Sequence, residues 1–248
     1  MSLKHFRYAA ALAWCLPLPA LAGMAVDVEI LDRKSGEVLP VYWHAGERHV
    51  AGEPGREYEI RLRNRQGDRV LAVTSIDGVN VITGKTAAPS QSGYVLDPWG
   101  RIDIDGWRKS MDQVAAFYFT ALPDSYAART GRPDHVGVIG VALFRERVRV
   151  MPMESERRAS AEAAAPSAGL LGDDARAEKR LGTGHGQRLD SGAVYTHFER
   201  ASEAPAEIVR IYYDSRRNLV ARGIIPRSRD RYARQQPEPF PGGFVPDP

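Results

Sequence analysis

The chain has 248 residues, and its formal net charge at neutral pH is only +3. Removal of the N-terminal segment described below would leave roughly 225 residues, enough for one or two domains with a hydrophobic core. The single cysteine, Cys15, lies inside that segment. The rest of the chain can therefore form no disulfide, no thiol nucleophile and no cysteine-ligated zinc site.

The first 22 residues have the pattern of a secretory signal peptide. Lys4 and Arg7 precede an apolar run over residues 8–18, and an A-x-A pattern ends at Ala22. The apolar run is shorter than the roughly 20 residues that a membrane-spanning helix needs. We therefore expect cleavage after Ala22, no transmembrane segment in the mature protein, and a location in the periplasm or outside the cell.

Short strands are predicted along residues 26–144. In YEIRLRN, the side chains of Tyr58, Ile60 and Leu62 alternate with charged ones, which is typical of a half-buried strand. The runs AAFYF and GVIGVALF lack alternation and indicate central strands covered on both faces. Eight or nine such runs, separated by Gly, Asp and Pro turns, predict an antiparallel sandwich or barrel-like domain, and the sandwich is favoured.

The composition changes after Arg149, where an Ala-, Glu- and Arg-rich stretch indicates a linker that is partly helical or disordered. Beyond it we expect strands over 193–200 and 206–213 and a helix over 216–222, with Asp214 as its N-cap and Gly223 as its end. These elements either dock on the sandwich as a small unit or complete its sheet.

The predicted fold class is thus mainly β, an antiparallel β-sandwich with a linker and a small C-terminal α/β segment. Its expected divisions are a signal peptide (1–22), the sandwich (23–149), the linker (150–181), a strand-strand-helix segment (182–227) and a Pro- and Gly-rich tail (228–248).

Three blocks of sequence carry a resemblance to a known family. They begin RVLAVTSIDGVNVITGKTAAPSQSGYVLDPWG, AAFYFTALPDSYAARTGRPDH and YTHFERASEAPAEIVRIYYDS. Together they resemble an uncharacterised family of exported proteins of Gram-negative bacteria. The resemblance implies export and a common fold, and it implies no activity and no catalytic residues.

The glycine-rich stretch LGTGHGQ is the first candidate site. Its backbone amides could cradle an anion, and His185 could bind a ligand or carry a proton. The stretch lacks the strand and helix context of a dinucleotide loop and the G-K-S/T ending of a P-loop. We therefore expect it mainly to be a flexible entry to the strand at Ala193, and we keep His185 as a ligand-binding candidate.

Two other stretches contain metal-ligating residue types. Asp103, Asp105 and Asp112 match ligand positions of a calcium loop, but Arg101 stands at the first ligand position, so a strand with outward aspartates is the favoured interpretation. In WHAGERH, two histidines flank a glutamate, and a hairpin end with exposed histidines is favoured over a zinc or copper site. No metal and no cofactor are predicted.

A recognition loop is the preferred site. Residues 84–93 are polar and are followed by two aromatic residues, an arrangement that suits a binding surface at the edge of a sandwich. The ligand-binding candidates are Lys85, Thr86, Gln91, Ser92, Tyr94, Trp99 and His185.

These observations favour an exported, non-catalytic binding or envelope-associated module. Its partner would be an unknown protein, glycan or envelope component and not nucleic acid. No G-x-S-x-G, S-x-x-K or H-E-x-x-H motif is present. One alternative is a periplasmic hydrolase or other enzyme that uses His185. Another is a metal-dependent or electrostatic structural protein of the envelope, because residues 145–234 are mildly cationic, with 18 basic and 13 acidic side chains.

Overall fold

A computed structural model describes residues 25–147 and 180–227 of the chain. The predicted signal peptide, nearly all of the predicted linker and the predicted tail lie outside the described residues. Within the described ranges, no helix is long and apolar enough to cross a membrane.

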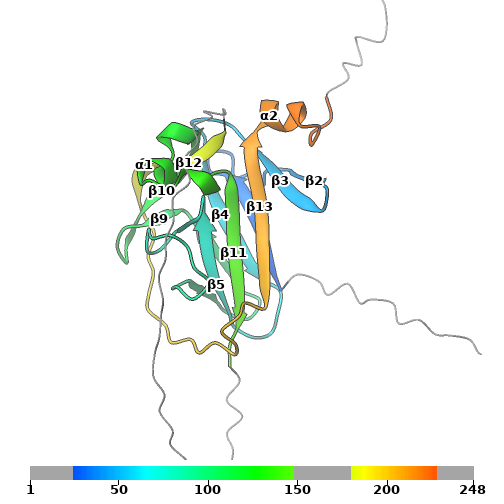
Figure 1. Cartoon of the computed structure of the whole chain (residues 1–248). Helices are drawn as coiled ribbons and strands as arrows, with labels where there is room; N and C mark the ends of the chain where they lie inside the picture. The colour runs from blue at the N-terminus through cyan, green and yellow to red at the C-terminus, as the bar shows by residue number, and fades with distance from the viewer. Residues whose placement is uncertain (1–24, 148–179, 228–248) are drawn as a thin grey trace, which may run out of the picture.

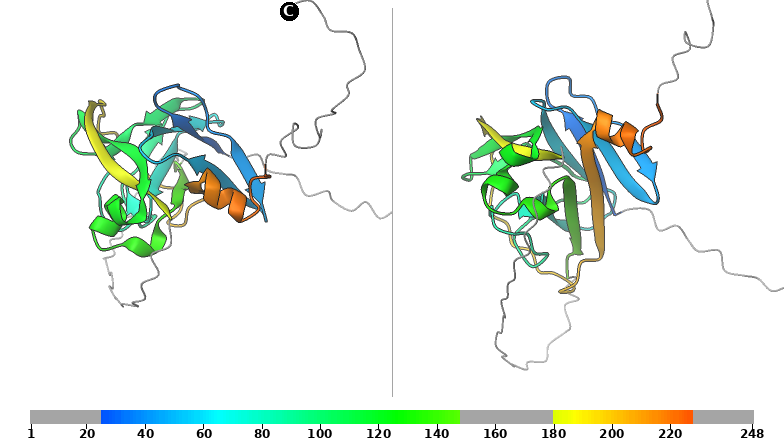
Figure 2. Two further views of the ribbon diagram at one scale, coloured as in Figure 1. Left: turned by 90° about the horizontal axis from the view of Figure 1, so that it is seen from above. Right: turned by 45° about the horizontal axis from the view of Figure 1, so that its top comes forward.

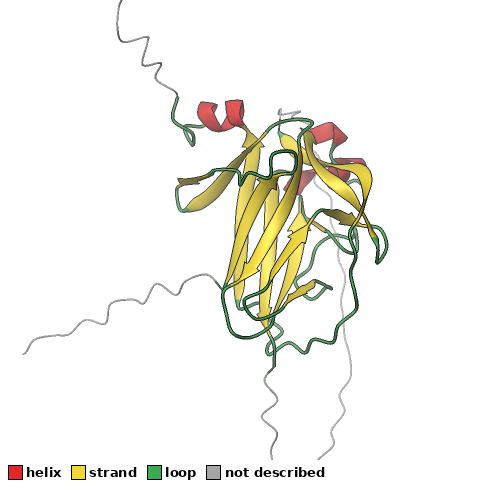
Figure 3. Ribbon diagram, turned by 180° about the vertical axis from the view of Figure 1, so that it is seen from behind, coloured by secondary structure: helices red, strands yellow, loops and turns green. Residues whose placement is uncertain are grey.

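Two β-sheets pack face to face, which confirms the predicted β-sandwich (Figures 1 and 3). The first sheet contains β1 (Val26–Asp32), β4 (Glu57–Asn64), β8 (Arg101–Ile104), β9 (Gly106–Arg108), β10 (Gln113–Ala121) and β12 (Leu181–Asp190). The second contains β2 (Val41–His44), β3 (Glu47–Gly52), β5 (Val70–Ile76), β6 (Val79–Asn80), β7 (Tyr94–Leu96), β11 (Val138–Arg145) and β13 (Glu207–Ser215). All paired strands are antiparallel except β3 and β13, which run parallel.

The core lies between the inner faces of the two sheets. Its largest fully buried side chains include Tyr58, Phe117 and Phe119, whose rings stack. The alternation in β4 is confirmed, because Tyr58, Ile60 and Leu62 are all buried. The two runs without alternation form β10 and β11, which have a neighbouring strand on each side. Continuous apolar sequence therefore marks the central strands, as expected.

The two C-terminal strands lie in different sheets. β12 pairs with β10 in the first sheet, and β13 lies between β11 and β3 in the second. The strand expected over residues 193–200 is wrong: this stretch has no ladder and forms only an isolated bridge between Arg200 and Glu146. It covers an apolar patch outside the second sheet, where the Arg200 guanidinium lies 4.1 Å from the centre of the Phe144 ring.

The glycine-rich stretch is a strand, so its expected role as a flexible entry loop is wrong. Residues 181–190 form β12, in which glycine is required by close packing. A Cβ at Gly182 would lie 2.6 Å from Cβ of Ser125, and one at Gly184 would lie 2.2 Å from the Tyr118 ring. The missing side chains let neighbouring groups approach the strand.

Short helical elements cover one end of the sandwich. Between β10 and β11 the chain forms η1 (Leu122–Asp124), α1 (Tyr126–Arg129) and η2 (Pro133–His135). α2 (Arg216–Ala221) follows β13 directly and packs beside the β2–β3 hairpin (Figure 2). Its N-cap is Ser215, whose side chain accepts the Asn218 amide, so the prediction of Asp214 was wrong by one residue. Gly223 has the expected positive φ of 75°.

Candidate functional site

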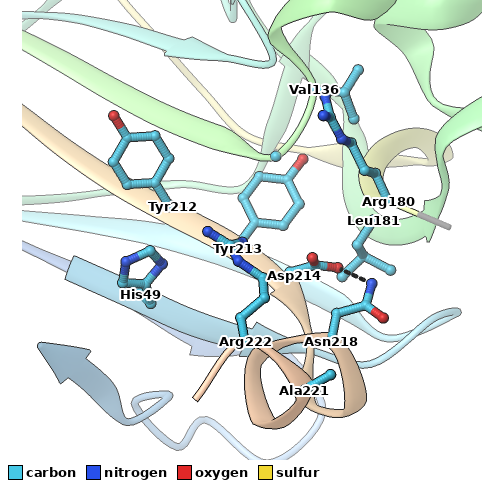
Figure 4. A pocket seen from close by; sticks show the side chains of 11 residues that line it. His49, Val136, Arg180, Leu181, Tyr212, Tyr213, Asp214, Asn218, Ala221 and Arg222 are labelled. Atoms are coloured by element: carbon cyan, nitrogen blue, oxygen red, sulfur yellow. Dashed lines mark hydrogen bonds between the residues drawn. The ribbon is translucent and has the colours of Figure 1, made fainter. Parts of the chain in front are cut away.

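A pocket lies at the end of the sandwich where β13 leads into α2 (Figure 4). Its volume is about 550 Å³, within the range of small-molecule sites. Its walls come from β3, β13, α2, the first residue of β12 with the residue before it, and the turn before β11. The lining residues are His49, Val136, Gly137, Arg180, Leu181, Tyr212, Tyr213, Asp214, Asn218, Ala221 and Arg222.

Local sequence sets the shape of this pocket. The Ser215 cap starts α2 immediately after the last strand residue, so Asn218 and Arg222 return over the end of β13. Gly137 has a φ of 99°, and a Cβ there would lie 3.2 Å from the backbone oxygen of Tyr213. Only glycine adopts this conformation without strain and leaves the space open.

His49 is the unusual group in the wall. Its side chain is only 2% exposed, and neither ring nitrogen has a hydrogen-bond partner among the described residues. Oε2 of Glu47 lies 3.6 Å from Nε2, too far for a hydrogen bond. The imidazole stacks on Tyr212 with 5.6 Å between ring centres. Buried polar groups without partners are rare in folded proteins and call for an explanation.

The charge state of His49 follows from its surroundings. Burial lowers the pKa of its imidazole below 6.5, and the positive charge of Arg222 lowers this pKa further, while Glu47 acts in the opposite direction. The ring is therefore neutral at pH 7, with one nitrogen as a donor and the other as an acceptor. Such a ring can make one hydrogen bond of each kind to a bound molecule.

Two guanidinium groups approach the pocket from different elements. In Figure 4, the Arg222 side chain lies between the His49–Tyr212 pair and the Asp214–Asn218 pair, and Arg180 lies beyond Tyr213. The Asp214 carboxylate accepts hydrogen bonds from the Asn218 side chain at 2.8 Å and from its neighbour's backbone amide. By contrast, the Arg222 guanidinium makes no hydrogen bond or salt bridge within residues 25–147 and 180–227.

A buried hydrogen-bond network supports the pocket from below. Asp77 accepts bonds from the Tyr213 hydroxyl at 2.6 Å, the Gly137 amide at 2.8 Å and the Thr183 amide at 2.9 Å. The Thr183 hydroxyl in turn bonds to the hydroxyls of both Tyr213 and Tyr58. Burial raises the pKa of Asp77 to about 6 despite these donors. The network ties the floor of the pocket to both sheets and leaves the Tyr213 hydroxyl engaged.

The lining chemistry suits binding more than covalent catalysis. No serine, threonine, cysteine or lysine is among the lining residues, and the lining carboxylate, Asp214, is held by the Asn218 side chain. Guanidinium groups bind carboxylates and phosphates through paired hydrogen bonds. The pocket therefore combines an anion-binding group, a neutral imidazole and aromatic walls.

The predicted recognition loop is an ordered connection held by backbone groups and by the side chains of Gln91 and Asn80. The Gln91 side chain bonds to the backbone of Thr86 and Ala88, and Asn80 bonds to the Ser92 carbonyl. The Lys85 carbonyl accepts the Asn80 amide. The side chains of Lys85, Thr86 and Ser92 are exposed and make no hydrogen bond or salt bridge within residues 25–147 and 180–227.

The two aromatic candidates, Tyr94 and Trp99, do not form a common surface with this loop. Tyr94 is buried in β7, and its hydroxyl accepts hydrogen bonds from Arg108. Trp99 is 68% exposed in the turn between β7 and β8, where its amide bonds to Gln66. Strand registers place this turn at the end of the second sheet where β13 begins, whereas the pocket lies at the end where β13 finishes.

His185 projects from β12 and lines neither the pocket nor a smaller cavity of about 250 Å³ beside Phe144. Its ring stacks on Tyr126 at 5.9 Å. Gly84 lies next to the same tyrosine, since a Cβ there would be 3.3 Å from its hydroxyl. The glycine-rich strand and the start of the polar loop therefore meet at Tyr126.

The calcium-loop residues have other roles. Asp103 lies in β8 and forms a bidentate ion pair with Arg61 at 2.8 and 3.1 Å, which confirms the strand interpretation. Asp105 accepts hydrogen bonds from Arg33 and Ser191. Asp112 lies in the turn between β9 and β10. No group of three or more His, Cys, Asp or Glu side chains is placed to hold a metal ion in the described part of the chain.

Comparison of the chain with protein-family models, curated proteins and solved structures gives no match. The family resemblance noted above stays a prediction. The site therefore has to be interpreted from its own geometry. Sequence reasoning found His49 but expected it to be exposed, which is wrong; it did not find Arg222 or Arg180. The sequence ERHVAG gives no sign of the parallel pairing of β3 with β13, which buries His49 against Tyr212.

Proposed function

We propose that this protein is an exported, non-catalytic binding module that holds a small anionic molecule in the pocket between β13 and α2. The proposal rests on one observation: the side chains of Arg222 and His49 line the same cavity. Arg222 supplies a guanidinium without a carboxylate partner in the described residues, and His49 supplies two buried nitrogens without hydrogen bonds. A carboxylate or phosphate on Arg222, with a polar atom toward His49, would satisfy both.

The proposal also accounts for the supporting structure. The Asp77 network fixes the Tyr213 side of the cavity, and the Asp214–Asn218 bond fixes the start of α2. A rigid, preformed wall lowers the entropy that a ligand loses on binding. Export is supported by the signal-like N-terminal sequence, and the periplasm or the outside of the cell is the expected location.

Thermal unfolding of residues 23–248 with a panel of small anions tests the proposal. The panel contains phosphate, sugar phosphates, dicarboxylates, sugar acids and amino acids, each at several concentrations. A ligand at 100 times its dissociation constant stabilises the folded state by about 2.7 kcal/mol, a shift of several degrees for a protein of this size.

Three variants decide whether the pocket is the site. Arg222→Gln should weaken binding about tenfold to hundredfold, because a hydrogen bond to a charged group contributes about 1.5–3 kcal/mol. His49→Phe keeps the stacking on Tyr212 but removes both nitrogens, and it should also weaken binding. Arg217→Gln is the matched control, since Arg217 is exposed on α2 but does not line the pocket. Equal affinity of all four proteins would refute the pocket as the site.

A further inference from the structure

We propose that a second surface, centred on His185 and separate from the pocket, binds an acidic polysaccharide. The surface consists of Tyr126, His185, Lys109, Arg129 and Arg188, and we call it the His185 patch. None of these residues lines the pocket. The patch is built from three elements: α1, β12 and the residue that follows β9.

Three aromatic rings in contact form the centre of the patch. Trp107 is buried, and its Nε1 donates a hydrogen bond of 3.0 Å to the Gly184 carbonyl on β12. The Trp107 ring lies 4.9 Å from the Tyr126 ring, which lies 5.9 Å from the His185 ring. Tyr126 thus contacts a buried ring on one side of the row and the exposed His185 ring on the other. The row of rings holds the His185 imidazole at the surface against a buried support.

Three positively charged side chains surround the His185 ring. The Arg188 guanidinium donates to the Gln113 side chain, and the Lys109 amide bonds to the Gln113 carbonyl, so both flank the same residue. Arg129 follows Tyr126 by three positions on α1 and shares its face of the helix. All three are exposed, and none forms a salt bridge within the described ranges. Partial burial and then these cations lower the pKa of His185, so its ring is neutral at pH 7.

The arrangement fits an extended anionic polymer better than the other anionic partners. The cations spread over an open surface, so they match charges that repeat along a chain instead of one enclosed anion. A single exposed ring offers a platform for one sugar ring but no row of platforms for successive bases. None of the exposed large apolar side chains of the described residues belongs to the patch, so it has nothing to insert into a lipid bilayer.

Fluorescence titration of residues 23–248 at several salt concentrations tests this inference. The probes are polygalacturonate and heparin, with dextran as a neutral polysaccharide, vesicles containing anionic phospholipid, and a single-stranded oligonucleotide. We expect both acidic polysaccharides to bind and dextran not to bind. The logarithm of the binding constant should fall linearly with the logarithm of the salt concentration, because counterions are released. Stronger binding of vesicles or oligonucleotide than of either polysaccharide would overturn the assignment of the partner.

Variants separate the roles within the patch. Each of Lys109→Gln, Arg129→Gln and Arg188→Gln should reduce the salt slope by about one and weaken binding about threefold to fivefold at low salt. His185→Ala should weaken binding without changing the slope, because a neutral ring releases no counterion. The control is Arg63→Gln, which removes the same charge from an exposed position elsewhere on the first sheet. An equal loss in Arg63→Gln would show that binding depends on total charge, and the patch would be rejected.

Discussion

The burial and hydrogen bonding of the key side chains in this protein depend on residues that are far away in the sequence. The pair Asp77-Gly78 is recognisable as a hairpin turn, and both residues have the positive φ that such a turn requires. Nothing local reveals that the Asp77 carboxylate is buried, since its partners Thr183 and Tyr213 are 106 and 136 residues away. His49 is similar, because its burial depends on Tyr212. Residue types could be predicted as candidates, but their environments could not.

The buried Asp77 carboxyl should make stability depend on pH. Its pKa is about 6 in the folded protein, above the ordinary value of 3.8. Between these values the folded state keeps a proton that the unfolded state has lost. The stabilising contribution is therefore complete below pH 4 and is lost as the pH rises through about 6. Its size is about 3 kcal/mol, because one pKa unit corresponds to about 1.4 kcal/mol.

Chemical denaturation of the wild type and Asp77→Asn between pH 4 and 8 measures this contribution. The amide does not titrate, so the stability of the variant should lack this pH-dependent contribution. The free energy of unfolding of the wild type, relative to that of the variant, should therefore fall by about 3 kcal/mol from pH 4 to pH 7 and then stay constant. Parallel stability curves would show that Asp77 does not titrate in this range.

At the scale of elements, hydrophobic pattern was informative and glycine content was misleading. The apolar patterns predict β4, β10 and β11. A strand buried on one face has alternating apolar residues, and a strand buried on both faces has a continuous apolar run. The glycines of β12 predict a flexible stretch, but in the structure they mark the close approach of α1 and Tyr118. Sequence alone cannot distinguish these two uses of glycine, because the difference lies in the neighbouring elements.

The packing role of Gly182 predicts a specific loss of stability. Gly182→Ala places a methyl group 2.6 Å from Cβ of Ser125 and 2.8 Å from Val136, so the α1 turn must shift. We expect a loss of about 1–3 kcal/mol in the free energy of unfolding, the usual cost of overpacking. Gly192→Ala is the control, with no atom within 4 Å of the new Cβ, and should change stability by less than about 0.5 kcal/mol. Equal effects of the two changes would contradict the packing argument.

For the whole molecule, the β-sandwich was predictable but the path of the chain through it was not. Alternation and turns indicate many short strands, whereas the choice of partner strand depends on contacts across the full length. β12 and β13 lie in different sheets, and the parallel pairing of β13 with β3 has no local signal. The pocket arises at this junction, so it could not be found before the topology was known.

This topology predicts one cooperative unfolding transition. β12 and β13 supply strands to both sheets, so neither sheet is complete without the C-terminal part of the chain. Trp107 is buried and bonds to β12, which makes its fluorescence a probe of that junction. Denaturation followed by tryptophan fluorescence and by far-ultraviolet circular dichroism should give coincident curves. An earlier fluorescence transition would indicate that the C-terminal strands detach from a sandwich that remains folded.

The most direct test of the proposed function is a crystal structure of the protein with the small anion that stabilises it most. We predict density for the anion between Arg222 and His49, with oxygen atoms within about 3.2 Å of the guanidinium group and of one imidazole nitrogen. An anion bound elsewhere, with the pocket between β13 and α2 unchanged, would contradict the account.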